Sequence, residues 1–289
     1  MRRRDFLLGS TAALGLAGCG RTAVPRPPSP VNITRAAAYS QDIYDTMRRV
    51  LAEHKLNVRG RRVVLKPNLV EFEPESAINR IPCWYMPRSK RSGNWARRGR
   101  LRKAPAIAGA RSIWPPPPDI SRLRLLYLPH TVLGSDLLVS MPKMKTHHWA
   151  GATPSMKNLF GIVPGGVYGW PKNVLHWAGI HQSIADLHSL FPNHFAIVDG
   201  IVGMDGNGPI QGLPKPAGVI VSGHDPVAVD ATCCRIMQIE PSRIEYLTLA
   251  GGLEGIAEEN IQQIGEKPDS VATRFELIME LRELRRVRA

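Results

Sequence analysis

The chain has 289 residues, of which 43% are hydrophobic, so an intrinsically disordered protein is excluded and one substantial core can form. Its formal net charge is +14, which taken alone would favour nucleic acid as a partner. Residues 80–111 hold ten Lys or Arg and no Asp or Glu, and subtracting these ten charges leaves only +4 for the rest of the chain. We therefore expect no nucleic-acid partner.

Residues 1–18 have the pattern of a signal peptide, with a charged start and an apolar stretch that is too short to span a bilayer. Arg3-Arg4 resembles the twin-arginine export signal, and Leu16-Ala17-Gly18 before Cys19 resembles a lipobox. We predict export by the twin-arginine machinery into the cell envelope. A lipid on Cys19 would then anchor the protein on the outer side of the cytoplasmic membrane or in the periplasm.

The rest of the chain is expected to form a tether and one folded body. Residues 19–39 are Pro-rich and predict an extended, mobile tether, and residues 40–289 predict a single α/β domain. Because predicted strands alternate with predicted helices, we expect a mostly parallel sheet flanked by helices. Helices are expected over 40–54, 175–191, 225–239, 243–255 and 270–289, and strands over 61–70, 135–143, 194–203 and 216–225.

Residues 80–118 do not fit this pattern. They hold three of the six Trp residues and end in four consecutive prolines. One interpretation is a disordered basic loop. The other is a reading-frame error, because the neighbouring frame permits an amphipathic helix with a glycine C-cap in place of this stretch. On either interpretation we expect a poorly ordered or non-native segment here, and the frameshift hypothesis predicts a missing base just after the codon of Asn79.

Polar residues collect where the predicted strands end, which is where ligands bind in parallel sheets. One cluster follows the first strand as Lys66-Pro67-Asn68, and the densest is "MPKMKTHHWAGATPSMKNLFGIVPG" after the second. Lysines can hold a carboxylate or phosphate, and glycines let backbone N–H groups approach such an anion. The predicted anion-binding residues are Lys66, Asn68, Lys143, Thr146 and Asn158, and the predicted catalytic residues are Lys145, His147 and Lys157.

Two aspartates follow the later strands. Asp199 lies in "VDGIVGMDGNGP", and Asp225 lies in "GHDPVAVD", where it is also a candidate helix N-cap before Pro226. Carboxylates could bind a divalent metal together with His147, or orient that histidine as a proton carrier. A structural role for each remains the alternative. The tentative metal ligands are therefore Asp199, Asp225 and His147.

Several of these blocks resemble the domain of unknown function 362 family. They are "KPNLV", the long stretch above, "VDGIVGMDGNGPIQG" and "DPVAVDA", and together they cover about residues 62–79 and 127–236. Some members of that family carry a ferredoxin-type iron–sulfur domain. This chain has no C-x-x-C pair, so we expect no iron–sulfur cluster from it.

Two functions remain open. The first is a membrane-anchored enzyme, dependent on a cofactor or metal and possibly redox-active, that acts on a small anionic substrate. The second is a lipoprotein that binds an anion or metal without turnover. The sequence does not specify the substrate, the reaction or the cofactor. A divalent metal is one candidate for the cofactor.

Replacing the residue that is predicted to carry the lipid tests the expected membrane anchoring. The Cys19→Ala protein lacks the thiol that would carry the lipid, so we expect it to leave the membrane fraction and to appear as soluble protein. Fractionation of cells that express the wild type or the variant measures this. Unchanged membrane attachment of Cys19→Ala would show that the protein is held there by something else.

Overall fold

The computed structural model describes residues 27–40, 42–68, 126–168, 173–191 and 193–285. The predicted signal peptide, Cys19 and the segment 80–118 lie outside these residues, as does the start of the predicted tether. Within the described residues, no helix is both long enough and apolar enough to cross a membrane.

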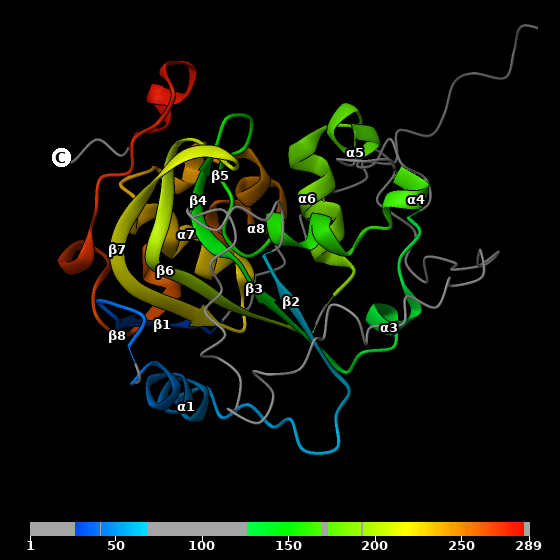
Figure 1. The fold of residues 1–289 in the computed structure, drawn as a ribbon, viewed down its shortest axis with the longest axis horizontal. Helices are drawn as coiled ribbons and strands as arrows, with labels where there is room; N and C mark the ends of the chain where they lie inside the picture. The colour runs from blue at the N-terminus through cyan, green and yellow to red at the C-terminus, as the bar shows by residue number, and fades with distance from the viewer. Residues whose placement is uncertain (1–26, 41, 69–125, 169–172, 192, 286–289) are drawn as a thin grey trace, which may run out of the picture.

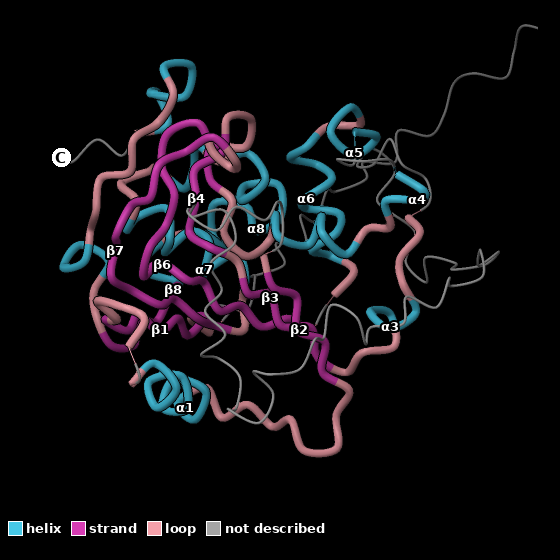
Figure 2. The backbone as a smooth tube through the Cα atoms, viewed as in Figure 1, coloured by secondary structure: helices cyan, strands magenta, loops and turns pink. Residues whose placement is uncertain are grey.

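The centre of the fold is an eight-stranded sheet (Figures 1 and 2). Six strands form a continuous path in the order β2-β3-β6-β7-β1-β8, and β4 pairs with both β5 and β6. Four of the seven pairings are parallel, which confirms the mostly parallel α/β sheet. The strands are β1 (Ser29–Arg35), β2 (Val63–Pro67), β3 (Leu137–Met141), β4 (Lys143–His147), β5 (Gly151–Ala152), β6 (His194–Asn207), β7 (Gln211–Gly223) and β8 (Ile261–Gly265).

Helices cover both faces of the sheet (Figure 1). α1 (Ile43–Glu53) packs on one face, and α6 (Ile180–Ser189), α7 (Pro226–Ile236) and α8 (Glu245–Ile256) pack on the other. The described residues also form three short helices: α3 (His130–Leu133), α4 (Gly165–Tyr168) and α5 (Asn173–Trp177). The 3-10 segments are η3 (Lys157–Ile162), η4 (Pro241–Arg243), η5 (Glu258–Asn260), η6 (Pro268–Val271) and η7 (Met279–Leu284).

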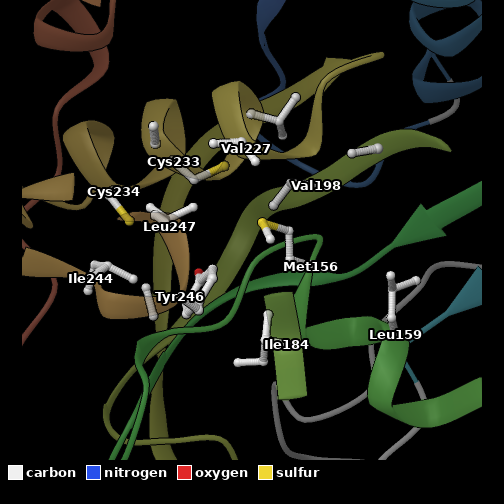
Figure 3. Packing of buried hydrophobic residues seen from close by; sticks show 14 of the residues in the cluster. Met156, Leu159, Ile184, Val198, Val227, Cys233, Cys234, Ile244, Tyr246 and Leu247 are labelled. Carbon is white, nitrogen blue, oxygen red and sulfur yellow. The ribbon is translucent and has the colours of Figure 1, made fainter. Parts of the chain in front are cut away.

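Strand periodicity divides the core into two clusters. In β3, Leu137 and Val139 pack with α1, whereas Leu138 between them packs with the cluster under α6, α7 and α8. Figure 3 shows this larger cluster, in which Met156 lies between Val198 of β6 and Ile184 of α6. Both faces of the central strands are therefore buried, as expected for a sheet with helices on each side.

The structure corrects three of the predicted elements. Residues 29–35 of the predicted tether form β1, which lies between β7 and β8, so this part is held in the sheet and is not mobile. The predicted C-terminal helix over 270–289 is absent from the described residues: η6 and η7 lie there, and Phe275 between them is fully buried. The predicted helix over 175–191 is divided at Gly179, whose φ of +114° is not helical.

Helix α7 connects the core to the loop after β5. As predicted, Asp225 caps its N-terminus, accepting hydrogen bonds from the backbone N–H groups of Val227 (3.0 Å) and Ala228 (3.3 Å). One turn later, fully buried Asp230 accepts from the backbone N–H groups of Ser155 (2.7 Å) and Met156 (3.1 Å). Asp230 therefore fixes the chain immediately before Lys157 and Asn158.

This buried carboxyl gives the fold a pH dependence that can be measured. Burial raises the pKa of Asp230 from 3.8 to about 7, against the opposing effect of its hydrogen bonds to Ser155 and Met156. The folded state thus holds this proton more tightly than the unfolded chain does, and the stability it contributes is lost as the pH rises from about 4 to about 7. In Asp230→Asn that contribution is absent.

We therefore expect the free energy of unfolding of the wild type, measured relative to that of Asp230→Asn, to fall as the pH rises through this range. Urea unfolding of both proteins at pH 5 and pH 8 measures it, and comparing the two cancels the titration of the buried histidines, which both proteins share. Unfolding curves whose separation does not change with pH would contradict the raised pKa.

Candidate functional site

Several of the predicted site residues lie where β2 and β3 end. Lys66 is in β2, and Asn68 is the first residue after that strand. The backbone N–H of Asn68 donates to the carbonyl of Met141 at the end of β3 (3.0 Å). After Pro142 the chain continues as β4, which carries the residues of the motif from Lys143 to His147. The carboxyl ends of two parallel strands and the whole of β4 are thus brought together.

Four side chains at this edge form a connected group, here called the lysine–asparagine cluster: Lys66, Asn68, Lys145 and Asn158. The Nζ of Lys145 donates to Oδ1 of Asn68 at 3.2 Å. The Nδ2 of Asn68 and the Nζ of Lys66 both approach Oδ1 of Asn158, at 3.5 and 3.3 Å. Of the predicted site residues, the structure therefore joins Lys66 and Lys145 through the side chains of two asparagines.

Asn158 is held in place by backbone and side-chain acceptors. Its Nδ2 donates to the carbonyl of Lys66 (2.9 Å) and lies 3.1 Å from Oγ of Ser140. The hydroxyl of Ser140 in turn donates to the carbonyl of Ser155 (2.8 Å). These bonds fix which way the amide faces, so its Oδ1 is presented to Lys66 and Asn68.

Gly161 lies against the side chain of Lys66. A Cβ at this position would lie 2.4 Å from Cε and 2.6 Å from Nζ of Lys66. The absence of a side chain at Gly161 therefore leaves room for the Lys66 side chain.

Lys143 has a buried partner. Its Nζ lies 2.9 Å from Oδ2 of Asp199 and 2.7 Å from the hydroxyl of Tyr39, and its side chain is 0% exposed. Tyr39 also donates to both carboxylate oxygens of Asp199 (3.0 and 2.9 Å). Burial raises the pKa of Asp199, whereas Lys143 and Tyr39 lower it. Lys143 was predicted to bind a substrate anion and Asp199 a metal; the structure instead pairs them with each other.

Lys145 is a buried lysine whose pKa is strongly lowered. Lys145 lies two residues after Lys143 in β4, so the two side chains leave the strand on the same side. Lys145 is only 1% exposed. Burial, and secondarily the charge of Lys143, lowers the pKa of Lys145 from 10.5 to about 7. A lysine with this pKa can gain or lose a proton near neutral pH.

His147 is fixed as a neutral hydrogen-bond donor. Its Nδ1 accepts from the backbone N–H groups of Trp149 (3.0 Å) and Ala150 (3.2 Å), which leaves the ring proton on Nε2. Burial, followed by the charge of Lys157, lowers its pKa far below the usual range. Because Nε2 carries the proton, neither ring nitrogen offers a lone pair, and the predicted roles as general base and metal ligand do not fit this geometry.

The remaining predicted residues separate into two groups. Half-buried Lys157 lies close enough to lower the pKa of His147, and its Nζ stands 3.9 Å from the ring centroid of Phe160. Buried Thr146 donates to the carbonyl of Gly206 (2.9 Å), which joins β4 to the end of β6. Lys157 therefore belongs to the surroundings of the site, whereas Thr146 has a structural bond.

Asp225 is not brought to the lysine–asparagine cluster. It follows β7, which β3 and β6 separate from β2, and besides capping α7 it accepts from Oγ of Ser29 (2.7 Å) at the start of β1. Among the described residues, no group of three or more His, Cys, Asp or Glu is arranged to hold a metal ion. The predicted metal set of Asp199, Asp225 and His147 is thus not assembled in the structure.

Sequence reasoning missed Tyr39 and Ser140 as supporting residues, and it assigned no role to Asp230. Tyr39 lies in the stretch assigned to the tether, Ser140 lies inside an apolar strand, and Asp230 lies within a helix. No spacing rule singles out the first two. The buried position of Asp230 could have been inferred from the apolar residues on all sides of it in "PVAVDATCCRI".

Residues 101–235 match the family described as domain of unknown function (DUF362). The chain contains a DUF362 domain. The match begins inside the segment 80–118 and includes β4, Asn158 and Asp230, but not Lys66 or Asn68. A thylakoid-associated protein of Synechocystis sp. is 29% identical over 131 residues, which are 44% of this chain and 40% of that protein. The chain thus matches less than half of its curated relative, and no solved structure matches it.

Removing the charge of Lys143 tests the electrostatics of the DUF362 site. We expect Lys143→Met to raise the titration midpoint of Lys145 above about 7, because the neighbouring ammonium that opposes its protonation is gone. NMR of protein with isotope-labelled lysine measures the midpoint, and Lys145→Gln assigns the signal. Exposed Lys267 provides the matched control, since Lys267→Met should leave the midpoint unchanged. A wild-type Lys145 that stays charged to pH 10 would contradict this account.

Proposed function

We propose that the DUF362 domain binds a small anion, such as a carboxylate or phosphate, at the lysine–asparagine cluster, and that Lys145 exchanges a proton with the bound substrate. On this proposal the protein is an enzyme that acts on a small anionic substrate. The single observation that carries it is the burial of Lys145, hydrogen-bonded to Asn68, beside a second buried lysine.

Physical chemistry supports an anion at this place. Two lysines of the cluster and the adjacent Lys157 place positive charge at one edge of the sheet, where the amides of Asn68 and Asn158 supply neutral hydrogen-bonding groups. Removing ammonium groups from water is costly, and an anion that accepts their hydrogen bonds offsets that cost. The bound anion would favour the charged form of Lys145 and so raise its pKa.

His147 would contribute as a donor. With its proton on Nε2 it can orient an acceptor group of the substrate without itself changing charge, while Lys145 on the same strand carries the proton that moves. The three residues predicted to be catalytic then have unequal roles: Lys145 exchanges the proton, His147 orients and Lys157 adds positive charge.

A second candidate, binding without turnover, is favoured by one observation. The Nδ1 of His147 is occupied by two backbone N–H groups, so the base that an enzyme would most often use is not available there. On this alternative the lysines hold the anion and no proton is transferred during a reaction. With either function, we also propose that the protein is exported and anchored through Cys19, as the N-terminal sequence predicts.

Proton uptake on binding tests the role of Lys145. At pH 8 the free Lys145 is mostly neutral, since its pKa is about 7, and an anion that raises this pKa will cause close to one proton to be taken up per anion bound. Acetate is the suitable probe because it stays ionised above pH 6. Calorimetric titration in buffers with different ionisation enthalpies measures the uptake.

The control is Lys145→Arg, which keeps the charge but cannot lose its proton. We expect it to bind acetate without proton uptake at pH 8. Failure of the wild type to bind acetate or inorganic phosphate would overturn the anion site. Binding with no proton uptake in the wild type would leave the anion site but overturn the role of Lys145.

A further inference from the structure

A series of aromatic rings runs beside the site. His147 stacks on His148 with ring centroids 4.8 Å apart, and His148 meets Trp149 edge to face at 4.8 Å. Trp149 contacts His176 of α5 at 5.3 Å, and His176 contacts Phe160 of η3 at 5.4 Å. Three separate parts of the chain, namely the end of β4 with the turn that follows it, η3 and α5, thus contribute to one continuous aromatic wall, defined as His147, His148, Trp149, His176 and Phe160.

The wall is buried at both ends and open in the middle. His147 is 3% exposed and Phe160 is 5% exposed, whereas Trp149 between them is 57% exposed. Leaving a tryptophan this exposed forgoes the favourable transfer of a large apolar surface from water. An indole supported on two sides by imidazole rings is also held in place, so a ligand that stacks on it does not have to order it first.

The aromatic wall adjoins positive charge at both of its ends. His147 is two residues from Lys145 along β4, and the Nζ of Lys157 stands over the Phe160 ring at 3.9 Å. Lys157 directly precedes Asn158 of the lysine–asparagine cluster. A ligand that reaches from the cluster to Trp149 would therefore meet cationic groups first and aromatic faces next.

We infer that the anion taken by this domain is aromatic, with its ionised group at the lysine–asparagine cluster and its planar ring against Trp149 and His176. This inference rests on the proposed anion site and specifies the substrate class of that same site. An aliphatic anion of equal charge would satisfy the lysines but would gain little from the rings, because stacking requires a flat π-system.

Trp177 allows recognition of a ring by the aromatic wall to be distinguished from the effect of any exposed tryptophan nearby. It is 75% exposed, more than Trp149, and belongs to the same helix as His176. Its ring makes none of the aromatic contacts that connect the wall. Trp177 is therefore the matched control: an exposed tryptophan near the site that should not contribute to ring recognition.

Benzoate and cyclohexanecarboxylate are suitable probes, since they have the same charge and similar size and differ in the π-system. We expect the wild type to bind benzoate about three- to tenfold more tightly. Trp149→Leu should lose this preference while still binding both anions, and Trp177→Leu should keep it. Calorimetric titration of the three full-length proteins with each probe gives the dissociation constants.

Each outcome decides between the proposals. If neither probe binds, the anion site itself fails. Equal binding of the two probes by the wild type overturns the aromatic inference and leaves the anion site standing. A benzoate preference that persists in Trp149→Leu also overturns it, because the ring then binds elsewhere. Phosphatidylglycerol vesicles that shift the emission of Trp149 while benzoate does not would assign this tryptophan to a membrane surface instead.

Discussion

The site depends on two lysines buried side by side on β4. Lys143 is completely inaccessible and Lys145 nearly so, and neither could stay charged there without compensation. Asp199 and Tyr39 compensate Lys143 through short, direct contacts. The charge of Lys143 is thereby kept in the core, where it acts on Lys145. Lys143 is thus compensated, whereas Lys145 holds its proton weakly. The proposed chemistry follows from this arrangement.

The rest of the fold supplies the positions. β6 brings Asp199 beside Lys143, because the two residues are direct partners in the parallel pairing of β4 with β6. α7 supplies Asp230, whose carboxylate accepts from two backbone N–H groups and so holds the loop that leads to Asn158. β2 supplies Lys66 and Asn68. Residues from distant parts of the sequence thus meet at one edge of the sheet, as the rule for parallel strand ends predicts.

The sequence specified the lysine–asparagine cluster better than its supports. Lys66, Lys145 and Asn158 each follow or interrupt an apolar run, and that pattern was enough to single them out as candidate site residues. β4 was not predicted as a strand, because only Met144 in "KMKTH" is apolar, whereas all five residues are buried in the structure. The partnership of Lys143 with Asp199 and Tyr39 also escaped prediction, since it depends on which strands pair.

Local signals failed where tertiary contacts decided the structure. Residues 270–289 have apolar residues at helical spacing, yet Phe275 is buried against Gly203 of β6, where a Cβ would come within 2.9 Å of its ring. Packing against the sheet therefore overrides the helical pattern. Residues 29–35 follow a proline-rich stretch that favours an extended chain, and the same extended conformation serves equally well as the strand β1 between two partners.

The most direct test of the central claim is a crystal structure of the full chain with benzoate bound. The account predicts the carboxylate within hydrogen-bonding distance of the Nζ atoms of Lys66 and Lys145, with the amide of Asn68 or Asn158 as a further partner. Benzoate bound only at another place, with the lysine–asparagine cluster unoccupied at saturating concentration, would contradict it.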